Sequence, residues 1–347
     1  MNRILTILVS AAAATLISGC AQQVTLSTGE QAQEYLELYM SKAYPGVQPD
    51  SWGMYILEDI PGTGDEWTAD CAYCNLRSTL RTIGGTIISS TEEAIAKQLD
   101  QDDYKPYKYY GPRYQKVDEG SGNAGLQYML EGMKVGGRRK AVIPAWLLTT
   151  SRYSTKEEYI KACSSSTHMI YDITFEGQCQ DILGYEVDLL EKYVKEHYGA
   201  SQESTTYKSD QGGGTFYFIS DTTAFKDEDR RSEDASLSLV YTGRRLDGQA
   251  FDTNSEKVAL KEGLFVTGKA YEDATVKFSD TYSSITMDGS SSLIDGFKGG
   301  LYKMHWSGQK ATVLFVSDLG YAASGSGDVI PPYSPLIFEL ELKGDDE

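Results

Sequence analysis

Apolar and polar positions along the chain group into two helix-forming stretches. The first, over residues 28–44, is apolar through its second half and stops at Pro45-Gly46, a pair that ends helices. Thr28 and Gln31 have the spacing of a capping box at its start. The second stretch covers residues 181–198 and ends at Gly199. The pattern therefore predicts one helix near the N-terminus and another near the middle of the chain.

Each predicted helix is followed by a polar stretch and then by an apolar, strand-like run, at 53–57 and at 214–218. The two helices also share their aromatic spacing, since Tyr39 and Tyr44 align with Tyr193 and Tyr198. Self-similarity at a fixed spacing indicates a repeated structural unit. We therefore expect one internal repeat of about 155 residues, made of a helix and a β-rich module.

Composition sets the domain count and excludes some partners. A chain of 347 residues with 40% hydrophobic residues is long enough for two domains with real cores. Its net charge of −18 disfavours binding to nucleic acid or to anionic lipid head groups, and the dispersed acids indicate a solvated surface. The three histidines fall in different elements without metal-ligand spacing. We expect them on the surface, with no metal site.

The N-terminus has the pattern of an export signal. Arg3 precedes an apolar run, 4–17, that is too short to span a bilayer, which takes roughly 20 residues. Small residues before Cys20 resemble the lipobox of bacterial lipoproteins. The resemblance implies cleavage before Cys20, lipidation of that residue and a membrane-anchored protein of the bacterial cell envelope, with the leaflet left open. The alternative is an ordinary signal peptide with an unlipidated Cys20.

Two segments of the C-terminal half, 238–254 and 293–342, carry a series of short motifs. They are Tyr241-Thr242-Gly243, Asp247-Gly248, Phe251-Asp252, Leu293-Ile294, Gly296-Phe297, Gly300-Leu301, Met304, Tyr321, Val329-Ile330-Pro331-Pro332 and Leu336-Ile337-Phe338. In these positions the chain resembles the FKBP-type peptidyl-prolyl isomerases, the immunophilins that bind FK506. From the Gly296-Phe297 pair to the end, the elements follow the order of that family.

The resemblance implies an α+β fold with two FKBP-like modules. Each is a twisted antiparallel sheet wrapped on a short helix and preceded by a packing helix. The expected segments are a signal peptide (1–19), a tether and helix (20–49), a degenerate first module (50–178), a linker helix (179–204) and an isomerase module (205–347). In the first module the stretch 132–144 is the best match, and the alternative is that this module is a different β fold that shares one motif. Ser78, Ile88, Ser89 and Leu126 stand there in place of Tyr241, Phe251, Asp252 and Phe297.

The resemblance also implies the site of the second module. Phe297, where the family usually has Trp, would form the floor under a prolyl ring. The expected walls are Tyr241, Phe251, Leu293, Ile294, Val329, Ile330 and Phe338. The Ile294 amide and the Tyr321 hydroxyl would hold substrate carbonyls, and Asp252 would orient the site by hydrogen bonding. Tyr241, Asp252 and Tyr321 are the candidate catalytic residues. No nucleophile, metal or cofactor is required.

The expected function is that of an exported, lipid-anchored folding factor that isomerises X–Pro bonds. Such bonds interconvert slowly because rotation breaks amide resonance. The expected partners are proline-containing polypeptides, an FK506-like ligand, and the membrane through the N-terminal lipid. A lipoprotein that binds peptides or other ligands on FKBP-like scaffolds without catalysis is the alternative.

The cysteines permit a disulfide prediction. Cys71 and Cys74 are three residues apart in an expected strand, so their Cα atoms would lie roughly 10 Å apart, beyond disulfide reach. By the resemblance, the start of this strand lies beside the end of the last strand of the first module, where Cys179 falls. Export to an oxidising compartment would permit a bridge. We therefore expect Cys179 to pair with Cys74, or less favourably with Cys71, which leaves Cys163 free or paired with the remaining one of these two cysteines.

Overall fold

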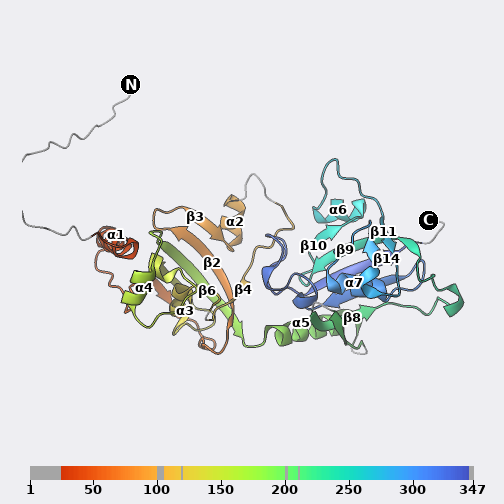
Figure 1. Ribbon diagram of the computed structural model, residues 1–347, viewed down its shortest axis with the longest axis horizontal. Coiled ribbons are helices and arrows are strands. Elements are labelled where there is room, and N and C mark those ends of the chain that lie inside the picture. The colour runs from red at the N-terminus through yellow and green to blue at the C-terminus, as the bar shows by residue number, and fades with distance from the viewer. Residues whose placement is uncertain (1–24, 100–104, 119, 200–201, 210–211, 344–347) are drawn as a thin grey trace, which may run out of the picture.

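The computed structural model describes residues 25–99, 105–118, 120–199, 202–209 and 212–343. Cys20 and the expected signal peptide lie outside these ranges, so the anchoring prediction stays a prediction. The described chain forms two lobes side by side, each built on one antiparallel sheet (Figure 1). None of the helices in the described ranges has the length and apolar character needed to cross a bilayer. The expected α+β fold with two sheet-and-helix modules is confirmed.

The first lobe contains a six-stranded sheet in the order β1-β5-β6-β2-β3, with β4 paired to β2. Its helices are α1 (Thr28–Ala43), α2 (Glu93–Leu99), α3 (Ala124–Leu130), the 3₁₀ turn η1 (Ala145–Leu147) and α4 (Lys156–Ala162). Its strands are β1 (Tyr55–Ile60), β2 (Tyr73–Thr82), β3 (Ile87–Ser90), β4 (Arg113–Lys116), β5 (Arg138–Ile143) and β6 (Met169–Cys179).

The second lobe contains an eight-stranded sheet in the order β12-β11-β9-β14-β13-β8-β7, with β10 paired to β9. Its helices are α5 (Ile182–Tyr198), α6 (Glu256–Glu262) and α7 (Asp295–Tyr302), with 3₁₀ turns η2 (Asp227–Asp229), η3 (Tyr282–Ser284), η4 (Ser317–Leu319) and η5 (Ala322–Ser324). Its strands are β7 (Thr205–Ser209), β8 (Gly212–Ile219), β9 (Ser236–Arg245), β10 (Ala250–Thr253), β11 (Ala274–Lys277), β12 (Thr286–Met287), β13 (Lys310–Phe315) and β14 (Leu336–Leu342).

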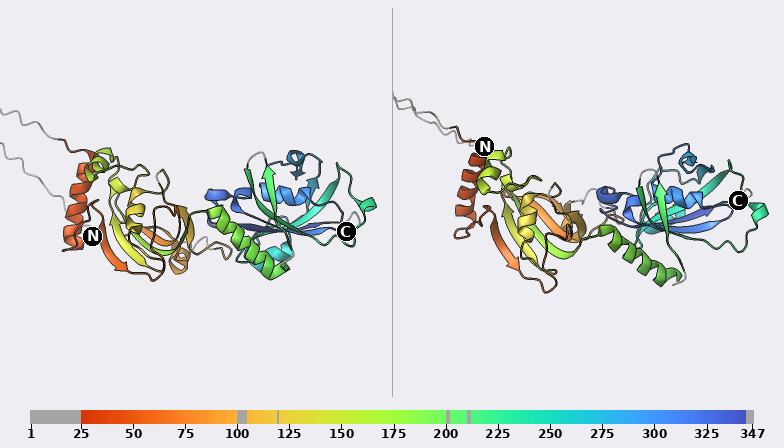
Figure 2. Two further views of the ribbon diagram at one scale, coloured as in Figure 1. Left: turned by 90° about the horizontal axis from the view of Figure 1, so that it is seen from below. Right: turned by 60° about the horizontal axis from the view of Figure 1, so that its bottom comes forward.

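The two sheets repeat one strand order. The run β1-β5-β6-β2-β3 of the first lobe corresponds to β8-β13-β14-β9-β10 of the second. Each sheet is preceded by its own helix, α1 or α5, and Figure 2 shows α5 lying along the second lobe. Leu36 and Met40 place α1 in the first core, whereas Leu190 and Val194 place α5 in the second. The predicted internal repeat is therefore present.

Local details differ from the sequence predictions. The capping box of α1 is formed by Ser27 and Glu30, one residue earlier than the expected Thr28 and Gln31. Ser and Thr hydroxyls cap helices in the same way, and both pairs have the spacing of a capping box. Spacing alone therefore could not decide which of the two residues begins the helix. His168 is 1% exposed and accepts a hydrogen bond from the Ala145 amide at 3.0 Å, so its expected surface position is wrong.

The expected disulfide is not formed. Cys71, Cys74, Cys163 and Cys179 are free thiols. Cys179 does lie beside the start of β2, as expected, but opposite Tyr73 rather than Cys74. Cys74 is buried and its sulfur accepts a hydrogen bond from the Trp67 indole at 3.2 Å. Among the described residues, no cluster of His, Cys, Asp and Glu has the arrangement of a metal site.

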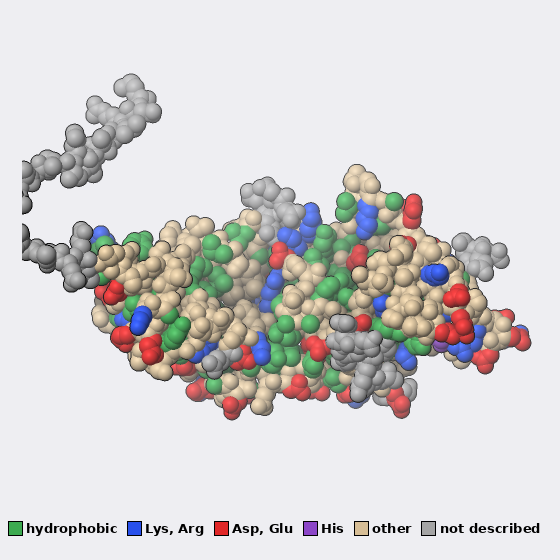
Figure 3. All heavy atoms as spheres, viewed as in Figure 1, with side chains coloured by type: hydrophobic (Ala, Val, Ile, Leu, Met, Phe, Trp, Pro, Cys, Tyr) green, Lys and Arg blue, Asp and Glu red, His purple; other side chains and the backbone are tan. Residues whose placement is uncertain are grey.

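Figure 3 shows how charged side chains are distributed over one face of the molecule. On the face shown in Figure 3, acidic side chains lie mainly along the lower edge and the right-hand end. Lys and Arg side chains gather along the junction between the two lobes. The exposure of these acids on this face agrees with the solvated surface expected from composition.

Candidate functional site

Aromatic side chains gather where α7 meets the sheet of the second lobe. Phe297, in the first turn of α7, is 4% exposed and lies edge-to-face with Phe338 of β14, ring centroids 5.0 Å apart. Tyr241 of β9 meets Phe297 at 5.6 Å, and Phe251 of β10 meets Phe338 at 5.6 Å, both edge-to-face. These are favourable geometries for aromatic pairs. The expected floor residue and three of its expected walls therefore form one connected group.

The remaining apolar candidates pack against the same core. Ile330 is buried within it, and four candidates are partly exposed at its edge, namely Leu293, Ile294, Tyr321 and Val329. They come from two segments, the start of α7 and the long loop between β13 and β14. The structure therefore brings the expected wall residues of the second module to one place.

Gly243 makes the ring packing possible. A Cβ atom added at this glycine would lie 2.6 Å from the Phe251 ring and 2.9 Å from the Phe338 ring. Real Cβ atoms do not approach other atoms so closely, so any side chain here would push one of the rings away. The glycine next to Tyr241 and Thr242 is thus required by close approach rather than by a turn.

Asp252 connects to the tyrosines of the site. The Tyr241 hydroxyl donates to Asp252 Oδ2 at 3.0 Å. Burial, and then the Asp252 charge, raise the pKa of Tyr241 above its usual value. The same two causes, in the same order, raise the pKa of Tyr321. Both hydroxyls therefore stay protonated, and remain hydrogen-bond donors, at neutral pH.

Two donors at the site have no acceptor among the residues that the structure describes. In the described part of the chain, neither the Ile294 amide nor the Tyr321 hydroxyl donates to another residue. Ile294 is the residue before α7, where a helix presents amides without intrahelical partners. Open donors beside an apolar floor are what a bound peptide needs for its carbonyl groups. These are the two groups expected to hold substrate carbonyls.

Asn254 is a positioning residue that the sequence analysis missed. Its Oδ1 accepts from the Tyr241 amide at 2.8 Å, and its Nδ2 donates to the Leu239 carbonyl at 2.7 Å. The side chain thus takes the place of a strand partner for β9 beyond the end of β10 and fixes Tyr241. An Asn directly after a strand often hydrogen-bonds to nearby backbone, so the residue type gave a hint. The sequence did not show the partners, because they lie 13 and 15 residues away.

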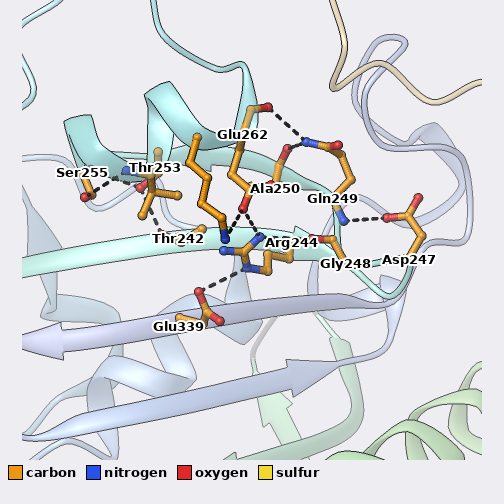
Figure 4. Close-up of polar contacts among 12 residues, drawn as sticks. Thr242, Arg244, Asp247, Gly248, Gln249, Ala250, Thr253, Ser255, Glu262 and Glu339 are labelled. Atoms are coloured by element: carbon orange, nitrogen blue, oxygen red, sulfur yellow. Dashed lines mark hydrogen bonds and ion pairs between the residues drawn. The ribbon is translucent and has the colours of Figure 1, made fainter.

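Polar contacts on the outer face hold β10 and α6 in place (Figure 4). Arg244 of β9 pairs with Glu262 of α6 at 3.3 Å and with Glu339 of β14 at 3.2 Å. The Thr242 and Thr253 hydroxyls lie 3.0 Å apart across the β9–β10 pair. These contacts lie on the face opposite Tyr241 and Gly243, so they support the site without entering it.

The register of the first sheet identifies the corresponding positions. Leu80 faces Ser89 in the first lobe as Gly243 faces Asp252 in the second. Ser89 therefore corresponds to Asp252 and Ser78 to Tyr241, as predicted when the sequences of the two modules were aligned. Ile88, at the position of Phe251, is 58% exposed, and Leu126, in α3, is buried. The hydroxyl–carboxylate pair and the aromatic floor are missing from the first lobe.

Known proteins resemble the second lobe in sequence. The family model described as FKBP-type peptidyl-prolyl cis-trans isomerase matches residues 263–343. FK506-binding protein 1A of Aspergillus fumigatus is 31% identical over 108 residues, which cover 31% of this chain and 75% of that protein. FK506-binding protein of Neisseria meningitidis serogroup C is 43% identical over 106 residues, covering 30% of this chain and 75% of the relative.

Among solved structures, FkpA from Escherichia coli is similar at 24% sequence identity, with 48% of this chain and 61% of that chain covered and a TM-score of 0.28. The two sequence relatives are covered over most of their length but account for less than a third of this chain.

Proposed function

Because the chain belongs to the FKBP-type peptidyl-prolyl cis-trans isomerases, we propose that it is an exported, lipid-anchored folding factor whose second lobe isomerises X–Pro bonds. We place the site where Tyr241, Asp252 and Tyr321 lie together beside the Phe297 floor, and this arrangement is the main support for the proposal. The first lobe has the same strand order without these groups. The substrates are proline-containing polypeptides, and an FK506-like macrolide would compete for the same place.

The geometry suits rotation about an amide. A twisted X–Pro amide has lost its resonance and is less polar than the planar one, so an apolar surface that excludes water favours the transition state. Phe297 and Phe338 supply that surface beneath the prolyl ring. The Ile294 amide and the Tyr321 hydroxyl bind carbonyls on either side of the rotating bond and hold the peptide while it turns. The Asp252 carboxylate fixes the Tyr241 ring against the floor.

The test compares equivalent positions in the two lobes. Asp252→Ala in the full-length protein removes the acceptor of the Tyr241 hydroxyl without emptying a large volume, so the fold should persist while isomerisation of a proline-containing peptide slows. Ser89→Ala, at the same register position of the first lobe, is the matched control and should leave the rate unchanged. A wild-type protein that folds but never accelerates isomerisation contradicts the enzymatic proposal.

A non-catalytic binding role is the second candidate. The first lobe supports it, because Ser78, Ser89 and Leu126 show that a lobe of this fold persists in the chain without the site. In that case the second lobe would bind an FK506-like ligand, detected by calorimetry, while leaving the rate of isomerisation at the uncatalysed value.

The anchoring proposal rests on the sequence before residue 21. Wild-type protein made in a bacterial host should carry a lipid-sized mass on its N-terminal peptide and enter the detergent phase. Cys20→Ser should abolish both, because several acyl chains are needed for firm membrane attachment and each buried methylene contributes about 0.8 kcal/mol. Wild-type protein without the added mass contradicts lipidation and supports an ordinary signal peptide.

A further inference from the structure

The long loop between β13 and β14, residues 316–335, is held in place by groups outside its own sheet. This β13–β14 loop carries Tyr321, Val329 and Ile330 of the candidate site. Its backbone has positive φ at Ala322 and Tyr333, a conformation that non-glycine residues rarely adopt. Such a loop keeps one conformation only where its surroundings fix it.

Arg245, at the end of β9, joins the loop to the first lobe. Its side chain is 7% exposed. Nη1 donates to the Val329 carbonyl at 2.7 Å and to the Tyr107 carbonyl of the first lobe at 2.9 Å. Nε and Nη2 donate to Asp247 Oδ2 at 3.1 and 3.0 Å. The planar guanidinium thus holds a site residue and the first lobe in one fixed geometry.

A second contact reaches the neighbouring residue of the loop. The Tyr109 amide, in the first lobe, donates to the Asp328 carbonyl at 2.7 Å. The Tyr109 ring lies 5.3 Å from the Arg245 guanidinium carbon, within range of a cation–π interaction, and its hydroxyl donates to the Pro112 carbonyl at 2.9 Å. Two consecutive loop carbonyls, at Asp328 and Val329, are therefore bound at the junction between the lobes.

The other end of the loop is held by the linker helix. Glu186 of α5 is fully buried and accepts hydrogen bonds from the Ser317 amide and, at 2.7 Å, from the Ser317 hydroxyl. Ser317 precedes Tyr321 by one turn of chain. The loop is thus fixed before Tyr321 and again at Val329, in both cases by groups outside the stretch that matches the isomerase family model.

We propose that the first lobe is a positioning element for the isomerase site, acting through Tyr107 and Tyr109 on the β13–β14 loop. The proposal rests on the proposed function of that site. A loop that moves among several conformations binds substrate only in the fraction of molecules with the right one, which weakens apparent affinity. Holding Asp328 and Val329 in advance removes that loss. The lobe without its own site thereby contributes to the site of its neighbour.

The activity test uses variants of the full-length protein. Tyr109→Ala and Arg245→Gln should each raise the KM for a proline-containing peptide by between about three- and tenfold, with a smaller change in kcat. Tyr109→Ala removes the ring beside the Arg245 guanidinium and leaves the backbone bond from the Tyr109 amide to the Asp328 carbonyl in place. Because both changes break the same ring–guanidinium contact, the double variant should be little worse than Arg245→Gln alone. Tyr109→Phe keeps the ring beside the Arg245 guanidinium, so its KM should equal that of the wild type. Tyr153→Ala, in the same lobe but away from this contact, is the matched control.

Hydrogen–deuterium exchange tests the proposal independently of catalysis. In Tyr109→Ala and Arg245→Gln, amides of residues 316–335 should exchange faster than in the wild type, while those of β9 and β14 stay protected. Exchange of the loop at the wild-type rate in both variants would overturn the positioning role. A wild-type protein without isomerase activity would instead count against the proposed function, and the exchange result would still decide whether the loop is held.

Discussion

At the scale of single residues, the site depends on the absence of a side chain as much as on those present. Gly243→Ala places a methyl group against the Phe251 and Phe338 rings. The rings must then shift, and overpacking of this kind costs about 1–3 kcal/mol. We expect a lower urea midpoint of unfolding and a larger KM for peptide.

The control for that change is Gly177→Ala. Gly177 lies in β6 with no atom within 4 Å of an added Cβ, and its φ is not positive. The urea midpoint of the Gly177→Ala variant should therefore stay close to that of the wild type. Equal destabilisation by the two substitutions would show that ring packing is not the reason for the glycine at 243.

The gathering of the predicted site residues in one place followed from the sequence, whereas the burial of individual residues did not. Tyr241, Asp252, Phe297 and Tyr321 are recognisable because their spacing follows a family motif. His168 shows the limit of such reasoning. No spacing distinguishes it from a surface histidine, and its burial comes from tertiary packing beside η1 and α1, with Ala145 donating to its ring and Tyr35 stacked on it.

At the scale of elements, one side chain controls how β9 meets β10. Asn254→Ala would leave the Tyr241 amide and the Leu239 carbonyl without their partners. An unpaired, partly buried polar group costs about 1–3 kcal/mol, so we expect reduced stability together with weaker peptide binding through a misplaced Tyr241.

Asn254→Asp separates the two bonds. An aspartate can still accept from the Tyr241 amide but cannot donate to the Leu239 and Glu272 carbonyls, to which Asn254 Nδ2 donates at 2.7 and 3.2 Å, so its effect on peptide KM should be smaller than that of Asn254→Ala. If both variants bind peptide like the wild type, as measured by calorimetry, Asn254 has no role in placing Tyr241.

Element types were predictable where a segment carries its own signals. The two long helices occur as expected, since their stops at Pro45-Gly46 and Gly199 are local features, and strands β1 and β8 overlap the apolar runs 53–57 and 214–218. Strand β7 was not predicted. Its existence depends on pairing with β8, which is a tertiary property rather than a pattern in the segment itself.

At the scale of the whole molecule, the two lobes should respond oppositely to pH. Burial lowers the pKa of His168 to about 4 and raises the pKa of Glu186 to about 7. A lowered histidine pKa means that the first lobe loses stability as pH falls from 6.5 toward about 4. A raised carboxyl pKa means that the contact of α5 with the second lobe loses stability as pH rises from 4.5 through about 7.

Each shift corresponds to roughly 3 kcal/mol across its window. Hydrogen exchange followed in each lobe across these pH ranges should show protection of β6 falling on acidification and protection of α5 rising. His168→Asn, which keeps an acceptor for the Ala145 amide, and Glu186→Gln should flatten the respective profile. A parallel response of both lobes would mean that other groups dominate the pH dependence.

The contact of Arg245 with Tyr107 and Val329 also has a consequence for the order in which the two lobes fold. The N-terminal lobe is synthesised first, and domains generally fold as units in that order. The surface that receives the β13–β14 loop is therefore formed before the loop itself. The sheet that carries the loop is complete only when the last strand, β14, lies between β9 and β13. The site proposed to catalyse a slow folding step is thus completed only at the end of the protein's own folding, against a surface that the N-terminal lobe provides.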